Sequence, residues 1–174
     1  MSERKGELHV RRRSWKQHLS LLSLTALLLW AAAPAAAQEL NDFNQRVISE
    51  FRANQGKVGG QFANRPVLLL TTTGAKSGRA LTRPLTYTTD GDRLVVIASF
   101  GGGPKNPSWY HNLIANPVAT VELGSERFRV RAAVTSGEER QRLFDRQAAQ
   151  IPSFAEYQKK TTRHIPVLVL KRID

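Results

Sequence analysis

The sequence predicts an α+β fold, a six-stranded and mainly antiparallel β-barrel with flanking helices, formed by one domain of the 174-residue chain. Six short runs are rich in apolar and β-branched residues, as strands are. Two pairs of these runs are joined by the turn sequences Asp90-Gly91-Asp92 and Gly124-Ser125, which favour antiparallel hairpins. Because an open sheet would expose two edges, closure into a small barrel is favoured.

The first 37 residues have the pattern of a targeting segment. A basic stretch at residues 11–16 precedes an apolar run at 19–30 and an alanine-rich run at 31–37. This order is typical of a secretory signal, and the Arg-Arg-x-aromatic sequence resembles a twin-arginine signal. The apolar part is also about long enough to span a bilayer. We therefore expect residues 1–37 to be a signal peptide or a membrane anchor. The protein would be exported or membrane-associated, with the cytoplasmic face as the alternative.

The body, residues 38–174, begins with a helical pattern over residues 41–52. Asn41 or Asp42 would cap this helix. Its apolar residues recur at helical spacing and share one face: Phe43, Val47, Ile48 and Phe51.

Three strands are expected next, over residues 67–73, 81–89 and 94–99. The first is apolar and β-branched, which is typical of a buried strand. A tight turn at 74–78 joins the first two strands, and Asp90-Gly91-Asp92 joins the second and third. Three glycines and a proline at residues 101–104 predict a loop without regular structure.

The second half of the body alternates helices and strands. Asn106-Pro107 opens a short helix that ends at Asn116-Pro117, with Pro107 in its first turn. Strands are expected over residues 118–123 and 128–134. A helix from 136 to 150 carries acidic residues near its positive end, a short helix follows over 152–160, and residues 165–170 form the closing strand.

The composition excludes several kinds of chemistry. Without cysteine, the chain has no disulfide, no thiolate nucleophile and no cysteine metal site. Its four histidines form no recognisable nucleophile or metal-ligand pattern, so neither hydrolysis nor a metal is expected. The formal charge of +12 suits an anionic partner such as a phosphate-bearing cofactor or a membrane surface. Since the basic residues of the body are dispersed, nucleic acid is not an expected partner.

Two glycine-rich stretches are candidate binding elements. The turn at residues 71–79 offers backbone N–H groups, a hydroxyl and two cations that can hold a phosphate, with an ordinary basic hairpin as the equal alternative. Three glycines at residues 101–103 let the backbone approach a flat ligand, and a flexible loop is the alternative. Hydride transfer from a bound cofactor needs orientation rather than a protein nucleophile, which fits a chain poor in catalytic groups.

Four aromatic residues near these stretches have two interpretations. Trp109 and Tyr110 lie on the expected short helix and are, by their size, more often core residues than cofactor stackers. Phe154 and Tyr157 share one face of the later helix, where they form either a lid over a flat substrate or part of the core.

Taken together, six strings resemble the deazaflavin-dependent nitroreductase family and cover nearly the whole body in order. They are TTTGAKSGR from Thr71, TRPLTY from Thr82, DGDRLVVIASFGG from Asp90, KNPSWYHNLIANP from Lys105, GEER from Gly137 and PSFAEYQKKTTRHIPV from Pro152. The resemblance implies a split β-barrel of the FMN-binding type. It also implies hydride transfer from reduced coenzyme F-420 (F420, an 8-hydroxy-5-deazaflavin) to a quinone-like or nitro acceptor.

The resemblance also implies site residues by position. The turn would hold the coenzyme phosphate, with Lys76 as cation and Ser77 as donor, and the strand end and loop would line the deazaflavin ring. The implied cofactor-binding residues are Gly74, Lys76, Ser77, Gly78, Arg79, Pro84, Ile97, Ala98, Ser99, Gly101, Gly102, Lys105, Asn106, Pro107, Trp109 and Tyr110. The acceptor side would be formed by Thr86, Phe154 and Tyr157. Tyr157 or Ser99 would be the catalytic group that hydrogen-bonds the developing anion.

Two departures from the family pattern leave alternatives open. Members commonly have arginine where this chain has Ala75 and lysine where it has Phe100, and each would contact an anionic part of the coenzyme. One alternative is therefore the same barrel using FMN. Another is a non-enzymatic protein that binds a cofactor or an anionic membrane surface. Similar barrels often dimerise, so a homodimer is a further expectation.

Overall fold

The computed structural model describes residues 24–174, with side chains from residue 37 onward. The chain divides into two compact units, and the barrel belongs to the unit Asp42–Asp174. Most of the predicted leader, residues 1–23, lies outside the described residues. No helix in the described part of the chain combines the length and the apolar character needed to cross a membrane.

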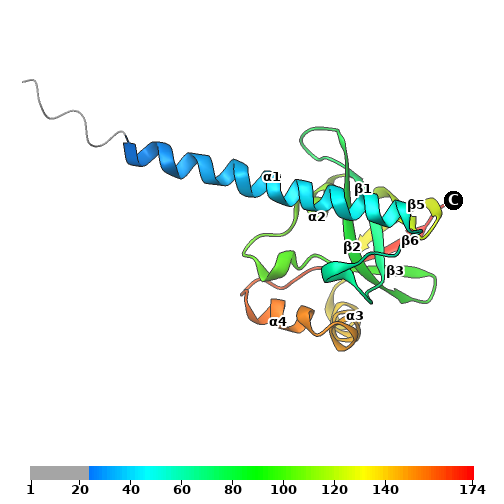
Figure 1. The fold of residues 1–174 in the computed structure, drawn as a ribbon. Coiled ribbons are helices and arrows are strands. Elements are labelled where there is room, and N and C mark those ends of the chain that lie inside the picture. Colours follow the sequence, from blue (N-terminus) through cyan, green and yellow to red (C-terminus); the bar gives the residue numbers. More distant parts are fainter. Residues whose placement is uncertain (1–23) are drawn as a thin grey trace, which may run out of the picture. The chain divides into compact units, whose positions relative to one another are not determined.

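Six strands form a closed barrel in the order β1-β2-β3-β6-β5-β4, and every neighbouring pair is antiparallel (Figure 1). The predicted six-stranded antiparallel barrel is therefore confirmed. The strands are β1 Val67–Thr73, β2 Ala80–Asp90, β3 Arg93–Ile97, β4 Val118–Leu123, β5 Glu126–Val134 and β6 Val167–Arg172.

Two strand ends differ from the predictions. β3 ends at Ile97 rather than at residue 99, because the Ser99 N–H turns back to the Ile97 carbonyl at 2.9 Å. β6 begins at Val167 rather than at residue 165 because Pro166, which has no N–H, cannot donate to a neighbouring strand.

In the part of the chain that the structure describes, four α-helices and two short 3-10 turns complete the fold. The helices are α1 Leu24–Ala53, α2 Ser108–Ala115, α3 Gly137–Gln150 and α4 Ser153–Lys159, and the 3-10 turns are η1 Gly60–Phe62 and η2 Phe100–Gly102. The predicted N-cap at Asn41 or Asp42 is wrong, because the alanine-rich segment before it has high helix propensity and α1 already runs through it. Pro107 is the N-cap of α2 rather than part of its first turn. The predicted irregular loop contains η2.

The barrel interior is one apolar cluster, closed at one end by α2. Alternate strand residues, such as Leu68 and Leu70 of β1, point into it. Trp109 and Leu113 of α2 join the same cluster and are 5% and 3% exposed. The short helix between β3 and β4 therefore acts as a plug for the barrel.

Three strands are buried on both faces, which explains their continuous apolar runs. The outward residues of β1, Val67 and Leu69, lie beneath Ile48 and Phe51 of α1. The outward residues of β3 and β6 are covered by α3 and α4, which lie side by side on one flank of the barrel (Figure 1).

The barrel opens along part of β2. Tyr87 pairs with Val96 and Asp90 with Arg93, so β3 covers only the second half of β2. Residues 80–86 of β2 pair with β1 on one edge and extend past the end of β3 on the other. Pro84, which lacks an N–H, stands in this stretch, where an unpaired strand edge tolerates it. The β1–β2 turn and the segment that leaves β3 therefore lie at the same end of the barrel as α2.

Candidate functional site

The β1–β2 turn is closed by its own backbone. The Gly74 N–H donates to the Arg79 carbonyl and the Gly78 N–H to the Gly74 carbonyl, both at 2.8 Å. A Cβ on Gly74 would lie 2.5 Å from the Ser77 Oγ, so a larger residue would displace the hydroxyl. The same Oγ accepts a hydrogen bond from the Arg79 N–H at 3.3 Å. The turn therefore has a defined shape and presents Lys76 and Arg79 as exposed cations.

Asn112 of α2 connects this turn to the helix by two hydrogen bonds. Its Oδ1 accepts a hydrogen bond from the Ala75 N–H, and its Nδ2 donates to the Thr72 Oγ1, both at 3.0 Å. Asn112 is 6% exposed. Asn112 was not predicted from the sequence, although its position on the same face as Trp109 and Leu113 placed a polar group among core residues.

Arg163 organises the other stretch, the segment 98–106 that follows β3. Its guanidinium donates to the carbonyls of Ala98, Ser99 and Gly103 and to the Oδ1 of Asn106. Arg163 was not predicted as a site residue from the sequence. A lone arginine between polar residues carries no local signal of such a role, because the acceptors of its guanidinium are all more than fifty positions away.

The glycines of this segment differ in their surroundings. Gly102 has φ +83°, and a Cβ there would lie 2.7 Å from the Tyr157 carbonyl oxygen, so its close approach is to the backbone of α4. The cofactor contact expected at Gly102 stays a prediction. Gly101, with φ +64°, faces open space. Phe100 has φ +49°, which is strained for a residue with a side chain, and is 54% exposed.

The end of the barrel that carries these stretches is cationic. No Asp or Glu occurs at residues 51–89 or 93–121 before Glu122. Among the ion pairs of the described residues, none involves Lys76, Arg79 or Lys105. At the opposite end, Asp90 is paired with three arginines. Arginine charges are thus neutralised by Asp90 far from the candidate site. The basic residues beside the site are left without an acidic partner among the described residues.

The predicted site residues fall into three groups by exposure. The buried ones are Gly74, Pro84, Ile97, Ala98, Gly102, Pro107, Trp109 and Phe154. The half-buried ones are Thr86, Ser99, Asn106, Tyr110 and Tyr157. The exposed ones are Lys76, Ser77, Gly78, Arg79, Gly101 and Lys105.

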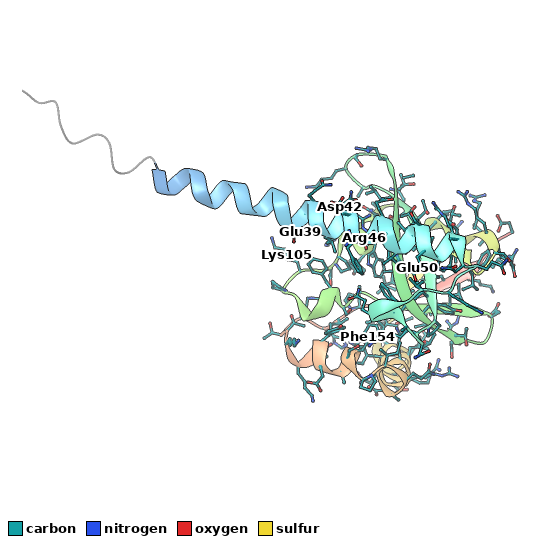
Figure 2. The ribbon with its side chains drawn as sticks, in the orientation of Figure 1. Glu39, Asp42, Arg46, Glu50, Lys105 and Phe154 are labelled. Carbon is teal, nitrogen blue, oxygen red and sulfur yellow. The ribbon has the colours of Figure 1, made fainter. Side chains whose placement is uncertain are left out.

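Two of the aromatic residues lie in the core. Trp109 belongs to the apolar cluster of the barrel interior. Phe154 of α4 belongs to the cluster that contains Leu143 and Phe144 of α3, and Lys105 stands on the loop ahead of α2 (Figure 2). Tyr157 meets Phe154 edge-on, with ring centroids 5.8 Å apart, and stays half-buried. Of the two interpretations of the aromatic residues, the structure therefore favours the core for Trp109 and Phe154.

The turn and the segment 98–106 both border α2, one through Asn112 and the other through the chain that leads into the helix. A cavity of about 750 Å³ lies elsewhere, at the opposite barrel end, between residues 55–58, residues 63–67 and the β4–β5 turn. The groove expected between the two stretches stays a prediction.

The closed six-stranded antiparallel barrel has the fold of the split-barrel reductases. Comparison with known proteins narrows this class. The family of F420H2-dependent quinone reductases matches residues 44–172, a range that includes all six strands. The chain belongs to this family.

Individual relatives agree with this assignment. An F420H2-dependent quinone reductase from Mycobacterium tuberculosis is 38% identical over 128 residues, which are 70% of this chain and 85% of the relative. A solved structure of an F420-H2 dependent reductase, FDR-A, is 40% identical with a TM-score of 0.57, over 65% of this chain and 100% of that one. A second solved structure, described as a domain-swapped dimer, is 36% identical with a TM-score of 0.59, over 78% of this chain and 99% of that one.

Proposed function

We propose that this protein is an oxidoreductase that transfers hydride from reduced F420 to a quinone-like or nitro acceptor. One observation carries the proposal: the family match spans the whole barrel, including the cationic end where the turn and the segment 98–106 meet α2. The match names F420H2 rather than FMN, so the FMN alternative has no support from it.

The described residues at this end fit an anionic, flat group. Among the hydrogen bonds of the described residues, none uses the backbone N–H of Lys76 or Ser77. These two donors, the Ser77 hydroxyl and the cations of Lys76 and Arg79 would hold the phosphate of the coenzyme. Gly101, whose Cβ position meets nothing within 4 Å, leaves room for a ring to lie against the backbone.

When bound, the reduced deazaflavin supplies a hydride, which together with a proton converts a quinone to a hydroquinone. The protein's own part is to orient the reactants and to keep water away. Tyr157, which is half-buried on α4 beside Gly102, would donate a hydrogen bond to the oxygen that gains negative charge. Ser99 is the second candidate for this donation.

The direct test mixes the purified chain with reduced F420 and menadione and follows coenzyme oxidation, alongside fluorescence titrations with F420 and FMN. We expect oxidation and F420 binding. Lys76→Ala should weaken binding by about tenfold or more, the cost of losing one hydrogen bond to a charged group. Lys57→Ala, which removes an exposed cation at the opposite end, is the matched control. If the unmodified chain shows no coenzyme oxidation and no F420 binding, the proposal is refuted.

The leader and the assembly state are proposals of their own. We propose that residues 11–37 export the chain or attach it to a membrane, and cell fractionation with N-terminal sequencing of the recovered protein tests this. We also propose a homodimer, supported by the relative described as a domain-swapped dimer. Light scattering of the purified chain would contradict the dimer if the mass were that of one 19.4 kDa chain.

A further inference from the structure

We propose that Arg163 is a positioning residue for this reaction: its guanidinium holds the segment 98–106 in the conformation that lines the cofactor. The inference rests on the proposed function, because it gives that segment a cofactor to meet. It adds a residue that neither the motifs of the sequence nor the family resemblance singled out.

The contacts of Arg163 converge on one segment. Nε donates to the Gly103 carbonyl at 2.9 Å, and Nη1 donates to the Asn106 Oδ1 at 2.6 Å. Nη2 donates to the carbonyls of Ala98 at 3.2 Å and Ser99 at 2.5 Å. One side chain therefore ties together both ends of the segment that runs from the end of β3 to the start of α2.

This arrangement calls for arginine rather than for any cation. Arginine has five N–H donors in a rigid planar fork, whereas lysine has one ammonium group on a flexible stem. All four acceptors are neutral oxygens, and no carboxylate pairs with Arg163 among the described residues. Burial lowers the pKa of the guanidinium, but arginine stays charged at any physiological pH.

The hydrogen bonds from Arg163 also set the direction of the backbone N–H donors on the outer side of the segment. Because a trans peptide places its C=O and N–H on opposite sides, a Ser99 carbonyl turned to Arg163 points the Phe100 N–H away from it. Ser99 is right-handed, with φ −71° and ψ −39°, and Phe100 has φ +49°. Successive N–H groups in such a pair form a concave site for a negatively charged oxygen. Among the described hydrogen bonds, none uses the N–H of Phe100 or Gly101.

The backbone conformation of Phe100 is a second reason why the segment needs the hydrogen bonds from Arg163. A residue with a side chain at positive φ is strained, and such a conformation persists only where the surroundings hold it. The hydrogen bonds from Arg163 to the carbonyls on both sides of this turn supply that restraint. Without them, we expect the turn at Phe100 to relax and the outward donors to lose their common direction.

The experiment compares Arg163→Lys with Arg140→Lys in the full chain. Arg140 is a matched control, because it is 5% exposed and donates to the Ile165 carbonyl and to Gln158, but to no residue of the segment 98–106. For each variant, F420 affinity is measured by fluorescence, kcat and KM for menadione by coenzyme oxidation, and Tm by circular dichroism. Amide exchange at Gly102 and Gly103 reports the segment without any cofactor.

We expect Arg163→Lys to weaken F420 binding and lower kcat by about tenfold or more, since small misplacements of reacting groups have large effects. Amide exchange at Gly102 and Gly103 should quicken. Arg140→Lys should lower Tm at least as much while changing kcat less than threefold, and guanidinium salt should partly restore binding to an Arg163→Gly variant.

Two results would overturn the inference. One is a wild-type affinity and kcat in Arg163→Lys, which would leave the proposed function intact. The other is an equal loss of activity in both variants at equal Tm, which would reduce Arg163 to a general stabilising role. If the unmodified chain itself fails to bind F420, the proposed function falls, and this inference falls with it.

Discussion

At the scale of single residues, the shape of the candidate site depends on glycine and on neutral hydrogen bonds. Gly74 makes room for the Ser77 hydroxyl, and Gly102 makes room for the backbone of α4. Asn112 joins the turn to α2 without any charge. The cations of the turn are therefore free to face a ligand, because neutral groups hold the structure.

Replacing Gly102 by alanine should destabilise the protein more than replacing its neighbour Gly101. Both residues have positive φ, which costs about 1–2 kcal/mol for a residue with a side chain. At Gly102 the new Cβ would also lie 2.7 Å from the Tyr157 carbonyl, which adds about 1–3 kcal/mol of overpacking. Urea unfolding of both variants measures the difference, and equal losses would contradict the packing of Gly102 on α4.

Replacing Asn112 by leucine should lower the free energy of unfolding by about 1–3 kcal/mol, because the Thr72 hydroxyl and the Ala75 N–H lose their partner. The same change should weaken F420 binding, since the turn would no longer be fixed to α2. Asn116→Leu, at the exposed C-terminal end of the same helix, is the control. Unchanged F420 affinity in Asn112→Leu would show that the turn keeps its position without this contact.

At the scale of elements, the two ends of β2 have different chemistry. Its first half lies along the opening of the barrel, beside the candidate site. At its other end, Asp90 accepts hydrogen bonds from Arg93 of β3 and from Arg142 and Arg146 of α3. The β2–β3 hairpin is thereby attached to α3 by charge, away from the proposed chemistry.

The stability of this end should depend on acid pH. The hydrogen bonds from Arg142 and Arg93 hold the pKa of Asp90 well below its ordinary value of 3.8. A carboxyl whose pKa is lowered by folding stabilises the protein above the unfolded pKa and loses that effect as the pH falls toward the folded pKa. We therefore expect the free energy of unfolding to fall below about pH 4, and to fall less steeply in Asp90→Asn.

Thermal unfolding between about pH 2 and 6 measures this dependence. Asp92→Asn, in the same hairpin but in none of the ion pairs of the described residues, serves as the control. Parallel curves for the unmodified chain and Asp90→Asn would show that this network contributes nothing to acid sensitivity. Added salt should flatten the difference, because these pairs are near the surface.

At the scale of the whole molecule, the formal charge of +12 is unevenly placed, because the turn at residues 74–79 and the segment 98–106 beside the candidate site contain no Asp or Glu. An anionic coenzyme should therefore be attracted before it makes specific contacts. We expect F420 affinity to fall by about tenfold between roughly 50 and 500 mM KCl, because salt screens charges beyond a few ångströms. Lys76→Ala should bind more weakly with a shallower salt dependence. An affinity independent of salt would contradict this account.

The sequence predicted the fold well because its signals are local. Alternating or continuous apolar runs mark strands, and Asp90-Gly91-Asp92 marks a turn, whatever the rest of the chain does. The predicted ends of helices and strands were wrong where another segment of the chain determines where the element begins or ends. α1 continues past Asn41 because of the alanines before it, and β3 stops early because the Ser99 N–H turns back to Ile97.

The candidate site was less predictable, because its geometry depends on long-range contacts. The glycines and Lys76 could be recognised from the residue types in the sequence alone. The partners of Arg163 and Asn112 were not, since these side chains act on segments tens of residues away. Nothing in the sequence shows that α4 returns to pack on Gly102. Buried aromatic residues such as Trp109 follow from size alone.

The strand order has a consequence for how the protein is made. β3 is the third strand along the chain, yet one of its two neighbours is β6, whose residue Val169 pairs with Val95. Until β6 has been synthesised, the other five strands are without the member that joins β3 to β5. A nascent chain would carry two open sheet edges until then, a state prone to wrong association. Synthesis of β6, rather than emergence of the first half of the chain, should therefore time the closure of the barrel.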